Sequence, residues 1–249
     1  NGDAKEAEKF LKEKGLAAVE KRANRATSEG IIVIKTRDSK AVMAELTCET
    51  DFVAKNEDFI AVGDKIAETA LEKGYTDIQD ELSNMMLDLA TRVRENMNLR
   101  RLTAVSVGSD EYIAHYIHSD KKTGVITALK SDKPDVFTGK VFKDFAYDCC
   151  LHAAAFTPLY VKKEDVDAAY IDEQLEVFRG QVAELQKPDN VKEGIVKGKL
   201  NKHLAEICFL EQAFVKDDKL SVAAKMKEVG KQLGANISLS KLVLWQLGQ

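Results

Sequence analysis

Apolar residues near the start of the chain follow the pattern of a β-hairpin. Residues 31–36 and 41–48 are rich in Ile, Val and Ala, and the polar residues 37–40 separate them. Two β-prone runs joined by a short polar segment are typical of two antiparallel strands and their turn. We therefore predict a hairpin over residues 31–48.

Helical spacing of apolar residues follows this hairpin. In residues 57–73 apolar side chains recur every three or four positions, and Gly74 stands where such a helix ends. Residues 79–97 carry a second apolar stripe at the same spacing, and residues 99–107 are again β-prone. The pattern predicts two helices and a strand after the hairpin.

The same order of elements occurs a second time. Residues 111–118 and 125–130 predict another hairpin, and a helix is expected to end near residue 156. Residues 220–233 predict a second helix, and residues 236–247 an alternating strand. Because both halves read hairpin, helix, helix, strand, we interpret the chain as α+β, a duplicated unit of small antiparallel sheets with helices.

Residues 158–219 separate the two helices of the second half. Within them, apolar positions spaced alternately by four and three residues predict a helix–helix seam. These positions are Ile171, Leu175, Phe178, Val182 and Leu185, then Val196, Leu200, His203, Ile207 and Leu210. Seven acidic residues and one basic residue give residues 164–186 a net charge of −6, whereas five basic and four acidic residues give 187–211 a net charge of +1. We predict an inserted antiparallel helical (coiled-coil) hairpin over about residues 160–215; two ordinary helices lying on the core are the alternative.

The first residues predict a short helix and a connector. Apolar residues share one face of residues 3–14, and Gly15 stands at the expected cap position. Residues 16–29 are polar, small and basic, as in a connector or a fraying helix. A lone helix of about 12 residues is marginal in water, so we expect it to be part of a helical module.

Length and composition fit one large domain or two small ones. The chain has 249 residues, 45% of them apolar and 31% charged, which excludes a disordered or collagen-like chain. Three parts are expected: a remnant of an N-terminal helical module with its linker (1–29), a first core subdomain (30–108) and a second that carries the hairpin (109–249). A net charge of −4 gives no strong attraction to nucleic acid or anionic lipid. No apolar run approaches the roughly 20 residues of a membrane helix, and residues 1–15 lack the apolar stretch of a signal peptide.

Four cysteines are too few for a disulfide framework in a chain of this length. Cys149 and Cys150 are adjacent and cannot bridge each other without strain. We expect all four to be buried small residues of a protein kept in a reducing compartment.

The motifs of catalytic and cofactor sites are missing from the sequence. It contains no glycine-rich phosphate loop, no dinucleotide-binding turn, no H-E-x-x-H pair and no spaced C-x-x-C pairs. His115 and His118 are three residues apart on a predicted strand, so they point to opposite faces and are poor ligands for one metal ion. His203 falls on the helical seam, where we expect it to pack rather than to act as a base. We therefore predict no catalytic residue, no metal and no cofactor.

Four arginines raise the question of nucleic-acid binding. Arg92, Arg94, Arg100 and Arg101 cluster where a predicted helix meets a strand. Aromatic residues do not alternate with them, as they do on many single-strand-binding surfaces. A solvated or salt-bridged face explains these arginines as well, and an RNA-associated protein is the alternative.

Residues 45–56 run from a predicted strand into a predicted helix, with the sequence E-L-T-C-E-T-D-F-V-A-K-N. Thr50 and Asn56 are both suitable N-cap residues. Phe52 lies between the strand alternation and the helical stripe. Its ring either folds back on its own helix as a hydrophobic staple or stands outward as a wedge for a partner, and the local pattern leaves both open.

The same segment resembles the signature of the elongation factor Ts family. Residues 50–55, Thr-Asp-Phe-Val-Ala-Lys, match its most characteristic stretch, whereas Thr47 stands where the family usually has Asn. Further matches follow in the family's order: Glu95-Asn96 with Arg100-Arg101, Tyr116-Ile117-His118 with Gly124, Leu210-Glu211-Gln212, and Phe214-Val215-Lys216-Asp217. The resemblance covers essentially the whole chain.

Departures from the family pattern are few. Arg94 replaces the Gly that commonly precedes the Glu-Asn pair, and Ala213 stands where Pro is usual. By the resemblance, the first helix corresponds to only the last part of a three-helix module similar to a ubiquitin-associated domain. A further C-terminal helix of some relatives is not expected after Gln249.

The resemblance implies a guanine-nucleotide exchange factor without catalytic groups of its own. Its partner would be elongation factor Tu, from which it releases GDP during translation elongation in the bacterial cytoplasm or an organellar matrix. It implies no direct nucleotide binding, no membrane and no nucleic acid. The wedge would consist of Thr50, Asp51, Phe52 and Val53, with Phe52 entering an apolar cleft of the GTPase domain. Secondary partner contacts are expected at Val93, Arg94, His118, Phe214 and Val215.

Two other functions stay open at this point. An RNA-associated adaptor of the translation machinery would use the four arginines. A hydrolase would turn over GTP without any partner.

Overall fold

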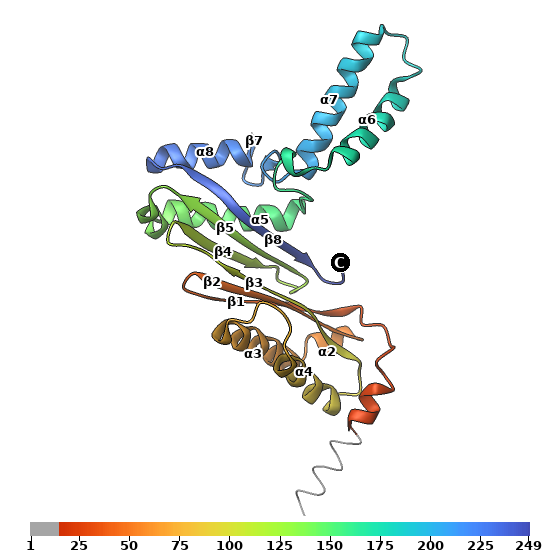
Figure 1. The fold of residues 1–249 in the computed structure, drawn as a ribbon, viewed down its shortest axis with the longest axis vertical. Coiled ribbons are helices and arrows are strands. Elements are labelled where there is room, and N and C mark those ends of the chain that lie inside the picture. The colour runs from red at the N-terminus through yellow and green to blue at the C-terminus, as the bar shows by residue number, and fades with distance from the viewer. Residues whose placement is uncertain (1–14) are drawn as a thin grey trace, which may run out of the picture. The chain divides into compact units, whose positions relative to one another are not determined.

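The first hairpin forms where the two β-prone runs predict it. The structure, a computed structural model, describes residues 15–249 and shows a mixed α/β fold of small antiparallel sheets and helices (Figure 1). Strands β1 (Glu29–Arg37) and β2 (Lys40–Cys48) pair antiparallel, with Glu29 opposite Cys48. Asp38 adopts a φ of 52° and supplies the left-handed residue that a tight hairpin turn needs.

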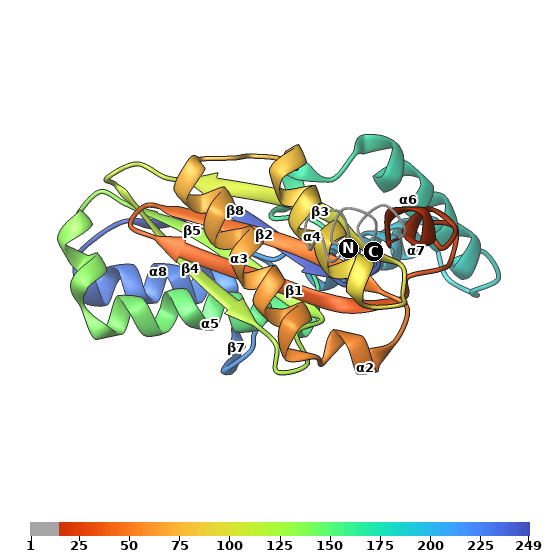
Figure 2. The same cartoon turned by 90° about the horizontal axis from the view of Figure 1, so that it is seen from below.

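Both faces of the first sheet are covered, which explains the consecutive apolar residues in its strands. The sheet has the order β1-β2-β3, where β3 is Met97–Ser106. Helices α3 (Glu57–Lys73) and α4 (Asp80–Arg92) lie on one face (Figure 2), where they pack on Ile31 and Val33. Ile32 and Ile34 point to the other face and belong to a second apolar cluster.

Helix α3 has the boundaries that its caps predict. The side chain of Asn56 accepts the N–H of Asp58 at 2.8 Å, and Gly74 ends the helix in the left-handed conformation with a φ of 70°. Gly63 lets the helix approach the sheet closely, because a Cβ there would lie 3.3 Å from the side chains of Ile31 and Leu46. The predicted helix over residues 57–73 is confirmed.

Helix α4 is shorter than its apolar stripe predicts. It ends at Arg92 rather than at Met97. In a continued helix the N–H of Asn96 would bond to the carbonyl of Arg92. Here it donates to the carboxylate of Glu49 at 2.6 Å instead. A bond to a distant part of the chain therefore stops the helix, and strand β3 begins at Met97.

The second sheet has the order β4-β5-β8, the same order of hairpin and final strand as in the first sheet. Its strands are β4 (Glu111–Ile117), β5 (Thr123–Ser131) and β8 (Ile237–Gln246). Gly124 at the start of β5 lies close to β1, since a Cβ on it would be 2.6 Å from Cγ2 of Ile32. The second predicted hairpin and the final strand are confirmed.

Eight elements lie between β5 and β8. They are η1 (Pro134–Thr138), α5 (Lys140–Phe156), η2 (Lys163–Asp165), α6 (Ala168–Val182), α7 (Asp189–Ile207), β6 (Ala213–Phe214), β7 (Asp217–Ser221) and α8 (Val222–Leu233). The sequence pattern misses the short pair β6 and β7. Because β7 uses the residues up to Ser221, α8 starts at Val222 rather than at Leu220, and the Ser221 hydroxyl caps it by accepting the N–H of Ala224.

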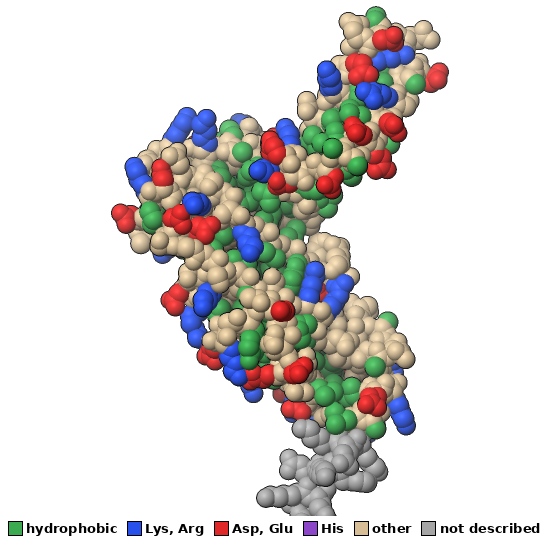
Figure 3. Space-filling model, viewed as in Figure 1, with side chains coloured by type: hydrophobic (Ala, Val, Ile, Leu, Met, Phe, Trp, Pro, Cys, Tyr) green, Lys and Arg blue, Asp and Glu red, His purple; other side chains and the backbone are tan. Residues whose placement is uncertain are grey.

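Helices α6 and α7 pack side by side in opposite directions (Figure 1). Near their connection, the Nζ of Lys192 donates to the carbonyl of Ala183; farther along, the Tyr170 hydroxyl and Nε2 of His203 are 2.8 Å apart. His203 thus packs between the helices, as expected. Positive and negative side chains are interspersed over the face of this pair that Figure 3 shows.

The chain forms two units, which we describe separately. One contains the residues up to Ala128 together with Val243–Gln249, and the other contains Leu129–Leu242. The subdomain boundaries expected from the repeated pattern, after residues 29 and 108, stay a prediction. Among residues 15–249, no helix has the length and apolarity needed to cross a membrane.

The connector before β1 begins with a helical segment. Residues 15–20 are helical, and turns follow until β1. The prediction that Gly15 ends a helix is wrong, because it lies in this segment, where a Cβ would be 3.0 Å from Cβ of Thr91. The helix predicted over residues 3–14 lies outside the described residues.

Candidate functional site

A one-turn helix carries the aromatic side chain singled out in the sequence. Helix α2 (Asp51–Ala54) follows β2, and Phe52 within it is 84% exposed. Ala54 is buried in the core of the first sheet, and Val53 is half-buried and packs on that core. The helix therefore turns one side inward and presents the ring on the other. The hydrophobic-staple interpretation of Phe52 is wrong.

The start of α2 is held by hydrogen bonds from several segments. Thr50 is its N-cap, and the Thr50 hydroxyl accepts the N–H of Val53 at 3.4 Å. The carboxylate of Glu95 accepts the N–H of Thr50 at 3.1 Å and its hydroxyl at 2.6 Å. The buried thiol of Cys48 donates to the Thr50 carbonyl. The base of the helix is thus fixed, whereas the ring of Phe52 is free of the core.

Asp51 lies beside a cavity of about 580 Å³. Lys55 donates to the Asp51 carboxylate at 2.7 Å, and this hydrogen bond lowers the pKa of Asp51. Residues 119–122 line the cavity too, and there Lys122 pairs with Glu29 at 2.7 Å. The hydrogen bond to Glu29 raises the pKa of Lys122, and the nearby Asp51 contributes a smaller effect. Two ion pairs therefore border the cavity next to α2.

The backbone around this cavity depends on Gly30. Its φ is 152°, and a Cβ would lie 2.0 Å from the carbonyl oxygen of Leu46. The neighbouring N–H of Ile32 donates to the carbonyl of Lys121 at 2.7 Å, which ties the turn after β4 to strand β1. That turn contains Lys121 itself in the left-handed region, with a φ of 58°.

Two of the expected secondary contact regions lie near α2. Val93 is half-buried and Arg94 is exposed, and both are in the turn that also contains Glu95. Since Glu95 holds the start of α2, this turn adjoins the helix. His118 is exposed and begins the turn 118–122, whose other residues line the cavity beside Asp51. One unit thus brings together residues 50–53, the 93–94 turn and His118.

The remaining two expected residues belong to the other unit. Phe214 is buried and stacks on the ring of His152. Val215 is 37% exposed, and its N–H donates to Nδ1 of His152 at 3.1 Å. Only Val215 of the pair offers side-chain surface to a partner, and the role of both residues stays a prediction.

Sequence reasoning did not assign Glu45 and Glu95 as anchoring residues. The buried carboxylate of Glu45 accepts hydrogen bonds from Arg100 at 2.8 Å, Arg101 at 2.5 Å and the N–H of Gly248 at 2.9 Å. Burial alone would raise the pKa of Glu45, but these three bonds lower it below its ordinary value. An acid inside an apolar strand was one available signal. For Glu95 the signal was an acid just past a helix C-terminus, where the helix dipole disfavours it unless it has a specific partner.

Among residues 15–249, no group of three or more His, Cys, Asp and Glu could hold a metal ion. All four cysteines are free and buried, as predicted. Burial raises the pKa of the Cys48 thiol to about 12 and also raises the pKa values of Cys149 and Cys208. Thiols of this kind stay protonated near neutral pH and are poor nucleophiles.

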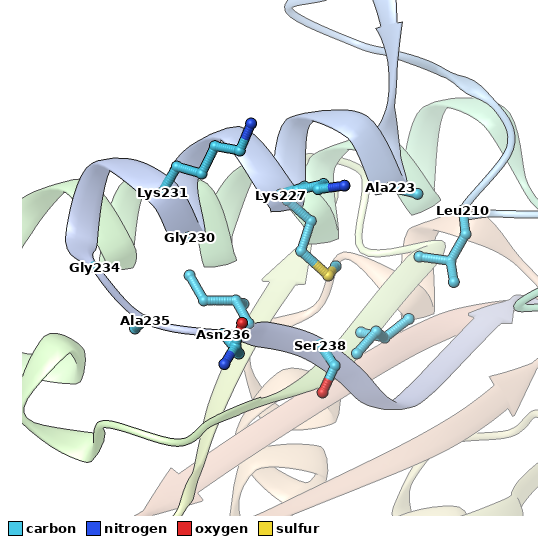
Figure 4. Close-up of a pocket in the computed structure, with 12 residues that line it drawn as sticks. Leu210, Ala223, Lys227, Gly230, Lys231, Gly234, Ala235, Asn236 and Ser238 are labelled. Atoms are coloured by element: carbon cyan, nitrogen blue, oxygen red, sulfur yellow. The ribbon is translucent and has the colours of Figure 1, made fainter.

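A second cavity, of about 700 Å³, lies between α8 and the start of β8 in the other unit (Figure 4). Its walls include Met226, Gly230, Ile237 and Leu239, and the side chain of Lys231 extends away from it. No Asp, Glu, His or Cys is among the residues that line it. Lysine, serine and asparagine supply its polar side chains, so its lining contains no carboxylate, imidazole or thiol.

Comparisons with known proteins agree with the resemblance read from the residues. A family model described as elongation factor TS matches residues 49–249. The elongation factor Ts of Treponema denticola is 74% identical over 248 residues, which cover 100% of this chain and 89% of that protein. The elongation factors Ts of Treponema pallidum and Borreliella burgdorferi are 57% and 35% identical, and each match covers 99% of this chain and 89% of the relative. The chain therefore belongs to the elongation factor Ts family, whose members are nucleotide exchange factors for elongation factor Tu in translation elongation.

Proposed function

We propose that this chain binds elongation factor Tu carrying GDP and promotes GDP release by inserting helix α2 into its partner. One observation carries the proposal: Phe52 is 84% exposed on a helix whose base is fixed by hydrogen bonds. Aromatic side chains are enriched among the residues that dominate protein interfaces. Because hydrogen bonds already hold the helix that carries the ring, binding costs little further conformational entropy, which favours Phe52 as an anchor residue.

The wedge acts on the groups that hold the nucleotide. Elongation factor Tu binds GDP through its phosphate loop and Mg²⁺. Phe52 enters an apolar cleft between helices of the GTPase domain and displaces the segment that supports the ion and the phosphates. Asp51, beside the ring, competes for hydrogen bonds there or repels the phosphates. Within the wedge, Thr50 caps helix α2 and Val53 packs on the core, so these two residues keep the helix in place.

Exchange then follows from thermodynamic coupling and needs no catalytic group of this chain. A factor that binds the nucleotide-free partner more tightly weakens nucleotide binding by the same ratio, and nucleotide weakens the factor in turn. An excess of GTP therefore displaces the factor. We place this function in the bacterial cytoplasm, because the relative from Treponema denticola is a bacterial protein.

Secondary contacts extend the interface beyond α2. His118 and the Val93–Arg94 turn lie in the same unit as the wedge and are available to the same partner. The other unit contributes Val215 and the helical pair α6–α7, which we interpret as a coiled-coil hairpin inserted into a duplicated α+β unit. The matching strand orders β1-β2-β3 and β4-β5-β8 support the duplication.

Neither rival function gains support from the described residues. Arg100 and Arg101 donate to the buried Glu45, and Arg101 also lies over the ring of Trp245 at 4.2 Å. Arginines engaged in this way are less available to phosphates of RNA. A GTP hydrolase would need a phosphate cradle, which the sequence lacks.

Stopped-flow release of a fluorescent GDP from elongation factor Tu tests the proposal. The wild-type chain should accelerate release, and Phe52→Ala should lose most of that acceleration while unfolding in urea at nearly the same concentration. Phe52→Leu keeps an apolar side chain and should retain part of the activity. Leu159→Ala is the matched control, because Leu159 is another exposed apolar side chain, at 68%, outside the proposed wedge.

Full acceleration by Phe52→Ala would reject the wedge. Equal affinity of the chain for elongation factor Tu with and without GDP would reject the coupling. GTP turnover by the chain alone would instead support the hydrolase.

A further inference from the structure

We infer that Glu95 is a positioning residue for the wedge, acting through helix α2 rather than by touching the partner. This inference rests on the proposed function. The Glu95 carboxylate accepts three hydrogen bonds from the residues that lead into α2. Its Oε2 accepts the N–H groups of Glu49 at 3.2 Å and Thr50 at 3.1 Å, and its Oε1 accepts the Thr50 hydroxyl at 2.6 Å.

The bond to the Thr50 hydroxyl sets the direction of the helix cap. A threonine hydroxyl has one proton to donate, and here it is used on Glu95. The lone pairs of the same oxygen are therefore left for the N–H of Val53, which donates to it. Without Glu95, the hydroxyl is free to rotate and to bond with water instead, and the cap loses its preferred orientation.

Helix α2 depends on this cap more than a longer helix would. It has four residues, from Asp51 to Ala54, and a single turn does not hold its shape in water by its own hydrogen bonds. Ala54 anchors its end in the core. Its start, next to Phe52, has Glu95 as the charged group that joins it to another segment.

The segment that carries Glu95 is itself fixed. Asn96 is buried, and its side-chain amide donates to the carbonyls of Ala23 at 3.1 Å and Arg25 at 2.7 Å. The N–H of Asn96 donates to the Glu49 carboxylate at 2.6 Å. The Glu95 carboxylate thus accepts the N–H of Glu49, and the Glu49 carboxylate accepts the N–H of Asn96, so hydrogen bonds in both directions join the two segments. Hydrogen bonds therefore hold the backbone in place where helix α2 begins.

This arrangement also gives a reason for the short helix α4. If the helix continued past Arg92, its carbonyls would take up the N–H of Asn96, and Glu49 would lose that partner. The turn after α4 places the Glu95 carboxylate against the residues before α2. The site therefore requires the break that the apolar stripe does not predict.

A double-mutant cycle with Phe52 tests the inference. Full-length wild type, Glu95→Ala, Phe52→Ala and the double variant are compared by the maximal rate of GDP release from elongation factor Tu and by the factor concentration at half that rate. We expect Glu95→Ala to lower the maximal rate about tenfold. In the Phe52→Ala background, the same change should alter the rate by less than about twofold, because the ring on which Glu95 acts is gone.

Three further variants separate positioning from folding. Glu81→Ala is the matched control: Glu81 lies on α4 in the same unit and accepts bonds from Lys73 and the Tyr75 hydroxyl, but none from α2. This variant should accelerate GDP release from elongation factor Tu as much as the wild-type chain does. Glu95→Gln keeps one acceptor oxygen and should retain part of the rate. Thr50→Val removes the hydroxyl that donates the 2.6 Å bond to Glu95 and should lower the rate as Glu95→Ala does. It therefore tests the same bond if Glu95→Ala folds poorly.

The outcomes distinguish this inference from the function on which it rests. If Phe52→Ala keeps full activity, the proposed wedge is rejected and the inference falls with it. If Phe52→Ala is inactive but Glu95→Ala and Thr50→Val both keep the wild-type rate, only the inference is rejected. An equal loss from Glu95→Ala in the presence and absence of the Phe52 ring would also overturn it, since Glu95 would then act by another route.

Discussion

Loss of the Glu45 carboxylate should strongly lower the stability of the unit that contains β1, β2 and β3. Its carboxylate is fully buried and accepts three hydrogen bonds, from Arg100, Arg101 and the N–H of Gly248. The Glu45→Ala change removes all three acceptors at once. It leaves two guanidinium groups and a backbone N–H without their partner, which is more costly than never having formed the pair.

The magnitude follows from how much water reaches the arginines. Removing one partner of a fully buried ion pair costs about 3–5 kcal/mol. The side chains of Arg100 and Arg101 are 38% and 29% exposed, so water compensates part of the loss. We therefore expect the lower end, about 3 kcal/mol, which corresponds to a fall in Tm of roughly 6–12 °C for a unit of this size.

Protonation of Glu45 should have the same effect as its removal. Its pKa in the folded chain is lower than the ordinary 4.5 of the unfolded chain. The unfolded state therefore binds the proton more readily, and the stabilisation is complete above pH 4.5 and is lost as the pH falls through the lower folded value. The difference in stability between wild type and Glu45→Ala should shrink over that range.

Urea unfolding followed by circular dichroism, at pH 7 and at steps below pH 4.5, measures both effects. Glu72→Ala is the control, because Glu72 pairs with Arg37 on the surface with 56% of its side chain exposed, and its loss should change stability by less than about 0.5 kcal/mol. A midpoint for Glu45→Ala close to that of the control at pH 7 would refute the reasoning, because the arginines would then have found equivalent partners.

Two further predictions concern titratable groups in each unit. Burial lowers the pKa of His152, and its Nδ1 must be unprotonated to accept the N–H of Val215. The stabilisation from His152 should therefore be complete above the ordinary pKa of about 6.5 and decline as the pH falls toward the lower folded pKa. Urea midpoints and the NMR chemical shifts of this ring measure the decline. A His152 ring that titrates at or above about 6.5 would contradict this. Lys55→Ala removes the hydrogen bond that lowers the pKa of Asp51, so the carboxyl shift of Asp51 in an NMR titration should move to higher pH without a change in fold. An unchanged titration of Asp51 would mean that Lys55 does not hold this carboxylate in solution.

Local rules account for most of the secondary structure in this chain. The boundaries of α3 follow from Asn56 and Gly74, two residues that act on their own neighbours. The end of α4 does not follow from local rules, because it is set by Asn96 and Glu49, which are 47 positions apart. The pair β6–β7 has only two residues in its first strand, too few for an alternation to show. Patterns predict elements where the deciding contacts are near in sequence and fail where they are not.

The candidate site shows the same division. Its position at the end of β2 was predictable, because the Thr50 and Asn56 caps and the strand alternation converge there. The exposure of Phe52 was not predictable from the pattern, since a staple and a wedge have the same local sequence. What decides is that Val53 and Ala54 occupy the inward side of the single turn, so no room is left for the ring on the core.

The residues that carry the family resemblance therefore have two different physical roles. Asp51 and Phe52 are displayed, whereas Glu45, Glu95 and Arg101 bond to other residues of their own unit. A loss of exchange activity on changing one of the second group would not by itself identify a partner contact. A double-mutant comparison, with and without the Phe52 ring, separates a residue that contacts the partner from one that only positions Phe52. A positioning residue affects exchange only while the ring is present.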